Sequence, residues 1–180
     1  MRKTTLLAIA ATAVLAVASL ASASDGPVVL WRQIVGIIPA GTVVGSGTGA
    51  VMGGFAPWTT TSGVARVNLA TGLAQFLVHG LVFAGTNFLG TPGPVTEVKG
   101  TLICDVDGSG GGGNSVLVET PAVPLSATGD AHFSGSLGSL PSVCQSGKNI
   151  AFVIRAAAFA GNPVPSGPWI ANGAVLVHQH

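Results

Sequence analysis

The sequence has no tyrosine, few other aromatic residues and very little charge. Aromatic residues make up 6% of the 180 positions and charged residues 7%, with seven basic and six acidic side chains. So few basic residues leave no patch that could neutralise phosphates, and we expect no nucleic-acid partner. No two carboxylates stand in a context that indicates acid–base catalysis.

The chain also lacks the short motifs of hydrolases and nucleotide-binding enzymes. No Gly-x-Ser-x-Gly lies between a predicted strand and a helix. None of the glycine-rich stretches is followed by the Lys-Ser/Thr pair of a phosphate-binding loop. We therefore predict no catalytic residue and no cofactor.

A long apolar run occurs only near the N-terminus. Residues 1–3 are Met-Arg-Lys, residues 6–20 are uncharged and mostly apolar, and residues 21–23 are Ala-Ser-Ala. This three-part pattern predicts a secretory signal peptide over residues 1–23, with an uncleaved N-terminal anchor as the alternative. Residues 24–180 contain no second run long enough for a transmembrane helix. We expect them to form one domain that is exported to the periplasm or the extracellular space.

The only two cysteines, Cys104 and Cys144, lie in the part that is predicted to be exported. In an oxidising compartment an even pair indicates one disulfide. A redox-active pair would more often have the spacing Cys-x-x-Cys. We therefore predict a structural disulfide.

Glycine and proline are frequent and scattered, and they separate short runs rich in Val, Ile, Leu, Phe and Thr. No long stretch has helical periodicity. Strands are predicted over residues 28–38, 64–69, 73–83, 95–104, 115–120, 130–137, 150–157 and 169–177, and residues 40–55 are expected to be irregular or a weak strand. About eight or nine strands with this spacing indicate an all-β fold, which we predict to be an antiparallel two-sheet sandwich.

Alternation within the strands predicts which side chains face the core. Ala65, Val67 and Leu69 share one face of their strand. Cys104 shares the inward face of the strand over residues 95–104, opposite Lys99, so the disulfide should be buried. The tryptophans are also expected to fill the core: Trp31, Trp58 and Trp169.

One loop matches part of a calcium-binding pattern. Asp105, Asp107, Ser109 and Gly110 occupy positions 1, 3, 5 and 6 of such a loop, but position 12 is Val116 instead of an acid. Acid-and-glycine turns also join strands without any metal. A calcium site and a plain turn are both open interpretations.

The four histidines are the other candidate ligands: His79, His132, His178 and His180. On a strand His178 and His180 would share a face and could chelate copper or zinc, although they end the chain. His79 lies in a mostly apolar strand, and His132 should face solvent. A metal site and ordinary core or surface histidines are the two interpretations.

The stretch 63–81, with Gly-Val-Ala-Arg-Val-Asn-Leu, a turn and Phe-Leu-Val-His-Gly-Leu, resembles the opening hairpin of the chordin-type repeat (CHRD) domain. Later segments are similar to those of uncharacterised secreted bacterial proteins with one disulfide: residues 100–104, 120–125, 129–135 and 151–155. The resemblance covers residues 60–177 and implies a sandwich fold without an agreed activity. The CHRD domain usually carries a His-x-His-x-Gly-like stretch after its first hairpin, where this chain has the lone His79-Gly80, so no catalytic residue transfers.

Together these features favour a secreted, non-enzymatic β-sandwich that binds an unknown partner, or has a structural role, at the cell surface or in the matrix. Low charge leaves more of the surface apolar, and extended apolar patches mark interaction sites, self-association included. One alternative is a copper or zinc enzyme, superoxide-dismutase-like, that uses His79 or His132 with the C-terminal pair. Another is a calcium-dependent adhesion module at Asp105 and Asp107.

Overall fold

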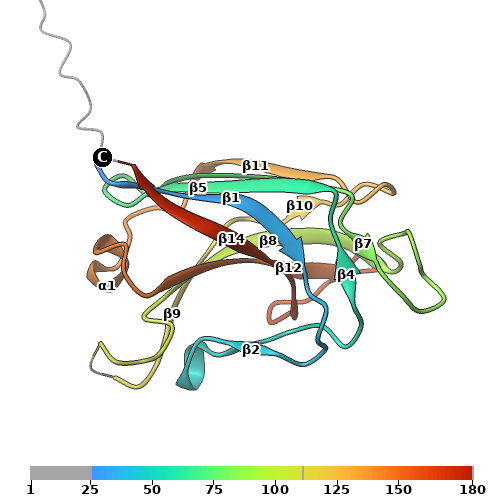
Figure 1. Cartoon of the computed structure of the whole chain (residues 1–180), viewed down its shortest axis with the longest axis horizontal. Coiled ribbons are helices and arrows are strands. Elements are labelled where there is room, and N and C mark those ends of the chain that lie inside the picture. The colour runs from blue at the N-terminus through green and yellow to red at the C-terminus, as the bar shows by residue number, and fades with distance from the viewer. Residues whose placement is uncertain (1–25, 111, 180) are drawn as a thin grey trace, which may run out of the picture.

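The structure, a computed structural model, describes residues 26–110 and 112–179, which form an antiparallel, almost entirely β-strand fold (Figure 1). The predicted signal peptide over residues 1–23 lies outside the described residues. Within them, the helical elements are a 3-10 turn, Gly47–Gly49, and the short helix α1, Ser142–Gln145. Neither is long and apolar enough to cross a membrane.

Ten strands form one sheet in the order β10-β8-β12-β14-β1-β5-β6-β11, with β9 paired to β8 and β13 paired to β12. These strands are β1 Val28–Gly36, β5 Ser62–Asn68, β6 Leu73–His79, β8 Val95–Cys104, β9 Val116–Glu119, β10 Val123–Pro124, β11 Ala131–Ser136, β12 Ile150–Phe159, β13 Asn162–Pro163 and β14 Trp169–Gln179. Two small ladders join β2, Val43–Val44, to β3, Val51–Met52, and β4, Trp58–Thr59, to β7, Val82–Phe83.

The large sheet curls so strongly that its two halves face each other. Figure 1 shows β1, β5 and β11 above β8 and β12, with β14 crossing between the two layers. Phe76 of β6 and Phe152 of β12 come from opposite halves, yet their ring centroids lie 6.1 Å apart. The ring centroid of Trp31, in β1, lies 5.4 Å from that of Phe152. The predicted antiparallel all-β fold is confirmed, and its two facing layers belong to one continuous sheet.

The core between the layers follows the predicted alternation. Ala65, Val67 and Leu69 are each at most 1% exposed, which confirms their inward face. The three tryptophans are also buried, as predicted: Trp31, Trp58 and Trp169.

β8 departs from simple alternation because it is buried on both faces. Lys99 and Thr101, on the side opposite the core, are only 8% and 0% exposed. Residues 42–53, here called the strap, contain β2 and β3 and lie on the far side of β8 and β12 from β1 and β5 (Figure 1). The strap is attached at both ends to Trp169. The indole Nε1 of Trp169 donates a hydrogen bond to the carbonyl of Thr42 at 3.0 Å, and the backbone of Gly53 forms an isolated β-bridge with that of Trp169.

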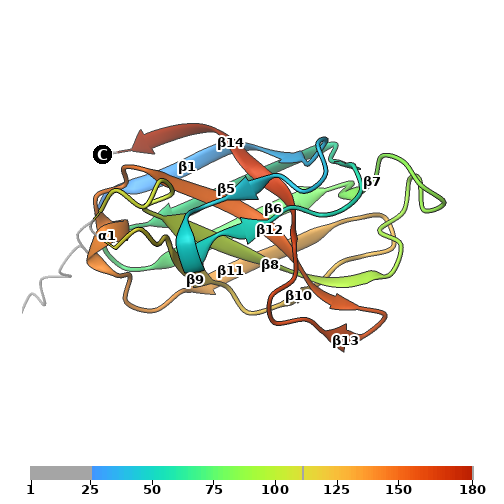
Figure 2. The same ribbon diagram turned by 90° about the horizontal axis from the view of Figure 1, so that it is seen from below.

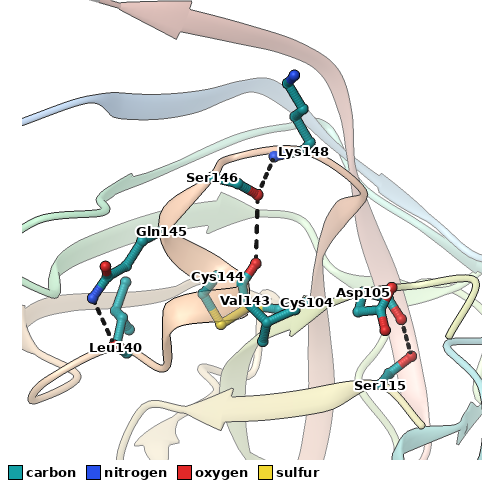
Figure 3. Close-up of a disulfide and its surroundings, with 9 residues drawn as sticks. All are labelled: Cys104, Asp105, Ser115, Leu140, Val143, Cys144, Gln145, Ser146 and Lys148. Atoms are coloured by element: carbon teal, nitrogen blue, oxygen red, sulfur yellow. Dashed lines mark hydrogen bonds between the residues drawn. A yellow bond between two sulfur atoms is a disulfide. The ribbon is translucent and has the colours of Figure 1, made fainter. Parts of the chain in front are cut away.

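The disulfide joins the end of β8 to α1 and confirms the sequence prediction (Figure 3). Cys104 and Cys144 are bonded, and both are fully buried. α1 has a single turn, and the covalent bond ties it to the end of β8. The paired ends of the described chain, Val28 and Gln179, lie at this same end of the molecule (Figure 1).

Candidate functional site

The predicted calcium loop turns its carboxylates onto hydrogen-bond donors of its own neighbourhood. Asp105, which is buried, accepts hydrogen bonds from the backbone N–H of Gly110 at 2.9 Å and from Asn149 Nδ2 at 3.1 Å. Asp107 accepts one from the backbone N–H of Ser109 at 2.9 Å. Hydrogen bonds from Ser109, its side chain first, hold the pKa of Asp107 below the ordinary 3.8. The loop is thus a turn whose acids already have N–H partners, and calcium binding there stays a prediction.

The three described histidines are all exposed, and they lie on three different strands: His79 on β6, His132 on β11 and His178 on β14. Nε2 of His178, in β14, lies 2.9 Å from the carbonyl oxygen of Gly147. His132 lies on β11 opposite Leu77 of β6. His180 is outside the described residues. Within residues 26–110 and 112–179, no three His, Cys, Asp or Glu side chains are placed to share a metal ion, so the copper or zinc site remains a prediction without a cluster behind it.

His79 has an acidic partner that sequence spacing did not reveal. Its Nδ1 lies 2.9 Å from Oδ1 of Asp130, which is 51 residues away in the sequence. A hydrogen bond from the Thr128 hydroxyl and then the one with His79 lower the pKa of Asp130 to about 2. Both side chains of the pair are more than 40% exposed. The pair therefore fixes the loop before β11 and has no enclosed space in which to do chemistry.

A stronger candidate lies at the end of the molecule opposite the disulfide. Three loops meet there: residues 37–41, residues 53–57 and residues 84–91. They are joined by hydrogen bonds from the backbone N–H of Trp58 to the carbonyl of Ile37, at 2.7 Å, and from that of Ala84 to the carbonyl of Pro57, at 2.9 Å. Figure 2 shows the loop that follows β7 projecting at the end away from α1 and the C-terminus. We call these three loops the apolar end.

The apolar end carries the three most exposed large hydrophobic side chains of the described residues. Phe55 is 84% exposed, Leu89 67% and Ile38 66%. Phe88, beside Leu89, packs against Phe83 with tilted rings whose centroids are 5.7 Å apart. Large apolar side chains that are scattered singly need no explanation, but several on adjoining loops indicate a contact surface.

The three loops themselves carry no charge, because residues 33–65 and 80–96 contain no Asp, Glu, Lys, Arg or His. The backbone of the projecting loop also satisfies many of its own polar groups. The N–H groups of Leu89, Gly90 and Thr91 donate to the carbonyls of residues 86, 83 and 88 at 2.9–3.3 Å. The projecting loop can therefore leave water at a low cost in unpaired polar groups.

A second site lies under the strap, where Lys99, Glu119 and Arg155 form a nearly buried ion cluster. The alternation placed Lys99 on the face of its strand opposite Cys104, and nothing in the sequence indicated that this face would be covered. The groups that contact its ammonium, Glu119 of β9 and the carbonyl of Pro165, are 20 and 66 residues away in the sequence, and no periodic pattern announces them. The one local signal was an arginine within the apolar run of β12.

The apolar end was likewise only partly visible in the sequence. The lack of charge over residues 33–65 and 80–96 could be seen there, but not the meeting of these stretches at one end of the sheet. Comparison of the chain with models of protein families, with curated proteins and with solved structures finds no match in any of the three.

Proposed function

We propose that this protein is an exported, non-enzymatic β-sandwich that attaches to the lipid layer at a cell surface through its apolar end. The observation that carries the proposal is the exposure of Phe55, Leu89 and Ile38 on adjoining loops without a charged residue among them. Export, predicted from residues 1–23, would bring this end into contact with surfaces outside the cytoplasm.

A lipid layer fits this end better than a protein does. The loop over residues 84–91 projects from the molecule (Figure 2), and the three loops offer no charge with which a protein partner could set orientation or specificity. Inside a lipid layer the backbone must find its hydrogen bonds within the protein, and the projecting loop already makes several of them. Aromatic and aliphatic side chains at the tips of such loops can insert to the depth of the headgroups without further hydrogen-bond partners for the backbone.

The expected association is weak and reversible. Full burial of a large aliphatic or aromatic side chain contributes about 1.5–3 kcal/mol. Ile38, Phe55 and Leu89 would gain only part of this, because each is partly covered already. The summed burial free energy of the three side chains is comparable to the binding free energy of a single fatty-acyl anchor, for which the association constant is about 10⁴ M⁻¹. Without charges, binding should be insensitive to salt and to anionic lipid.

Co-sedimentation of the exported chain with phosphatidylcholine vesicles tests this proposal. Phe55→Asp and Leu89→Asp should each weaken binding by tenfold or more, since each places a charge where the lipid would lie. The matched control is Leu73→Asp. Leu73 is 56% exposed but lies at the start of β6, outside the three loops, so this variant should bind like the unchanged protein.

Two results would overturn the proposal. One is equal vesicle binding by the unchanged protein and both charged variants. The other is concentration-dependent dimerisation in sedimentation velocity that Phe55→Asp abolishes while no form binds vesicles, which would assign the apolar end to self-association.

A further inference from the structure

The ion cluster under the strap carries an unbalanced positive charge. Glu119 binds two cations: Lys99 Nζ lies 2.5 Å from its Oε2, and Arg155 Nη1 lies 2.5 Å from its Oε1. The side chains of Lys99 and Arg155 are only 10% and 6% exposed. Two buried cations thus share one carboxylate. Because a buried charge is costly unless it is paired, the cluster favours one further anion.

The donors that remain point to the place where this anion would bind. Lys99 Nζ also donates to the carbonyl of Pro165 at 2.8 Å, and Arg155 Nε donates to that of Gly167 at 2.8 Å. Among the described residues Arg155 Nη2 makes no hydrogen bond, although every fully buried side-chain nitrogen or oxygen there has a partner. Arg155 Nη2 must therefore be open to the space beside it.

Arg155 lines one such space, a hollow of about 450 Å³ between the strap, β9 and the loop before β14. Arg155 and Glu119 contribute its charged lining. Met52 and Leu117 contribute apolar lining, and Ser166 lies in the loop that closes one side. An ionic group and an apolar body can therefore be accommodated side by side.

We propose that this hollow binds a small organic carboxylate with a short apolar tail. Arg155 would donate to the carboxylate from Nη2. A guanidinium suits this role better than an ammonium, because its planar set of donors can hold Glu119 and Gly167 and still offer Nη2 to the ligand. Met52 and Leu117 would contact the tail. The excess positive charge disfavours amines, and the apolar lining favours organic acids over inorganic phosphate. The site uses none of the residues of the apolar end, so the two proposals stand or fall separately.

Isothermal titration of the exported chain with hexanoate tests the site, with hexylamine, hexanol and inorganic phosphate as comparison ligands. Hexanoate should bind saturably and at least tenfold more tightly than the other three. Ser166→Trp should weaken hexanoate binding at least tenfold by filling the hollow, while it retains all three ionic side chains of the cluster. Ser139→Trp is the control, because Ser139 is also exposed but lies in the loop before α1.

Each other outcome would overturn the proposal. Absence of saturable hexanoate binding to the folded protein removes the site. Equal affinity for hexanol shows that Arg155 has no part in it, and equal affinity for phosphate shows that the apolar lining has none. Unchanged hexanoate binding by Ser166→Trp, with a melting temperature like that of Ser139→Trp, places the ligand elsewhere.

Discussion

Gly100 lies in β8 where two aromatic rings from opposite layers of the core meet. A Cβ at this position would lie 2.6 Å from Cζ of Phe152 and 2.9 Å from Cδ1 of Phe76. Only a glycine lets both rings pack directly on the backbone of the strand. The reason for this glycine could not be seen in the sequence, because Phe76 and Phe152 belong to strands that meet it only in the folded sheet.

Replacement of Gly100 by alanine should destabilise the fold by about 1–3 kcal/mol, the usual cost of overpacking a core. The free energy of unfolding in urea would measure this loss. Gly112→Ala is the control, since a Cβ there has no neighbour within 4 Å. Equal midpoints for Gly100→Ala and the unchanged protein would show that the rings can move aside.

Asp130 determines a second property at the residue scale, the response to acid. Its pKa is lowered from 3.8 to about 2, first by the Thr128 hydroxyl and then by His79. The folded state therefore favours the charged carboxylate. This contribution to stability is complete above about pH 4 and is lost as the pH falls towards 2.

The variant Asp130→Asn should melt at a lower temperature than the unchanged protein at pH 7. The difference should shrink as the pH falls from 4 to 2, because the unchanged protein then loses the same interactions. Calorimetry over this range would show the effect. A difference that stays constant with pH would contradict the assignment, and Glu97→Gln, whose carboxylate makes no hydrogen bond within the described residues, is the control.

At the scale of elements, the sequence predicted the hairpin around residue 70 well. The predicted strand over residues 64–69 corresponds to β5, and the turn has Gly72 at a φ of +72°, as the tight turn requires. The predicted strand over residues 73–83 is instead two strands, β6 and β7. They are separated at Gly80, whose φ is +62°. The chain therefore leaves β6 there, and β7 pairs with β4 outside the large sheet.

At the scale of elements, the disulfide is the feature that the sequence alone predicted most clearly. It spans 40 residues, and cross-linking a loop of this length stabilises a fold by about 4 kcal/mol in the chain-entropy model. The double variant Cys104→Ala, Cys144→Ala should lose stability of this order in urea unfolding. A loss below about 1 kcal/mol would show that the sheet holds α1 in place without the bond.

At the scale of the whole molecule, strand patterns predicted an antiparallel sandwich but not the way it closes. Alternation indicates which face of a strand is buried, not which strands become neighbours. β1 pairs with the last strand, β14, and this ladder joins the two layers into one curled sheet. The same curl gathers the charge-free loops at one end, opposite the paired ends of the described chain.

Attachment to lipid through the apolar end is the central claim, and a tryptophan placed there would report on it directly. Phe55→Trp puts an indole at the most exposed large hydrophobic position among the described residues. With vesicles that contain brominated phosphatidylcholine, the fluorescence that this indole adds should be quenched and shifted to shorter wavelength. The indole of Leu73→Trp should show neither change. Equal quenching of the two variants, or quenching of neither, would contradict attachment through the apolar end.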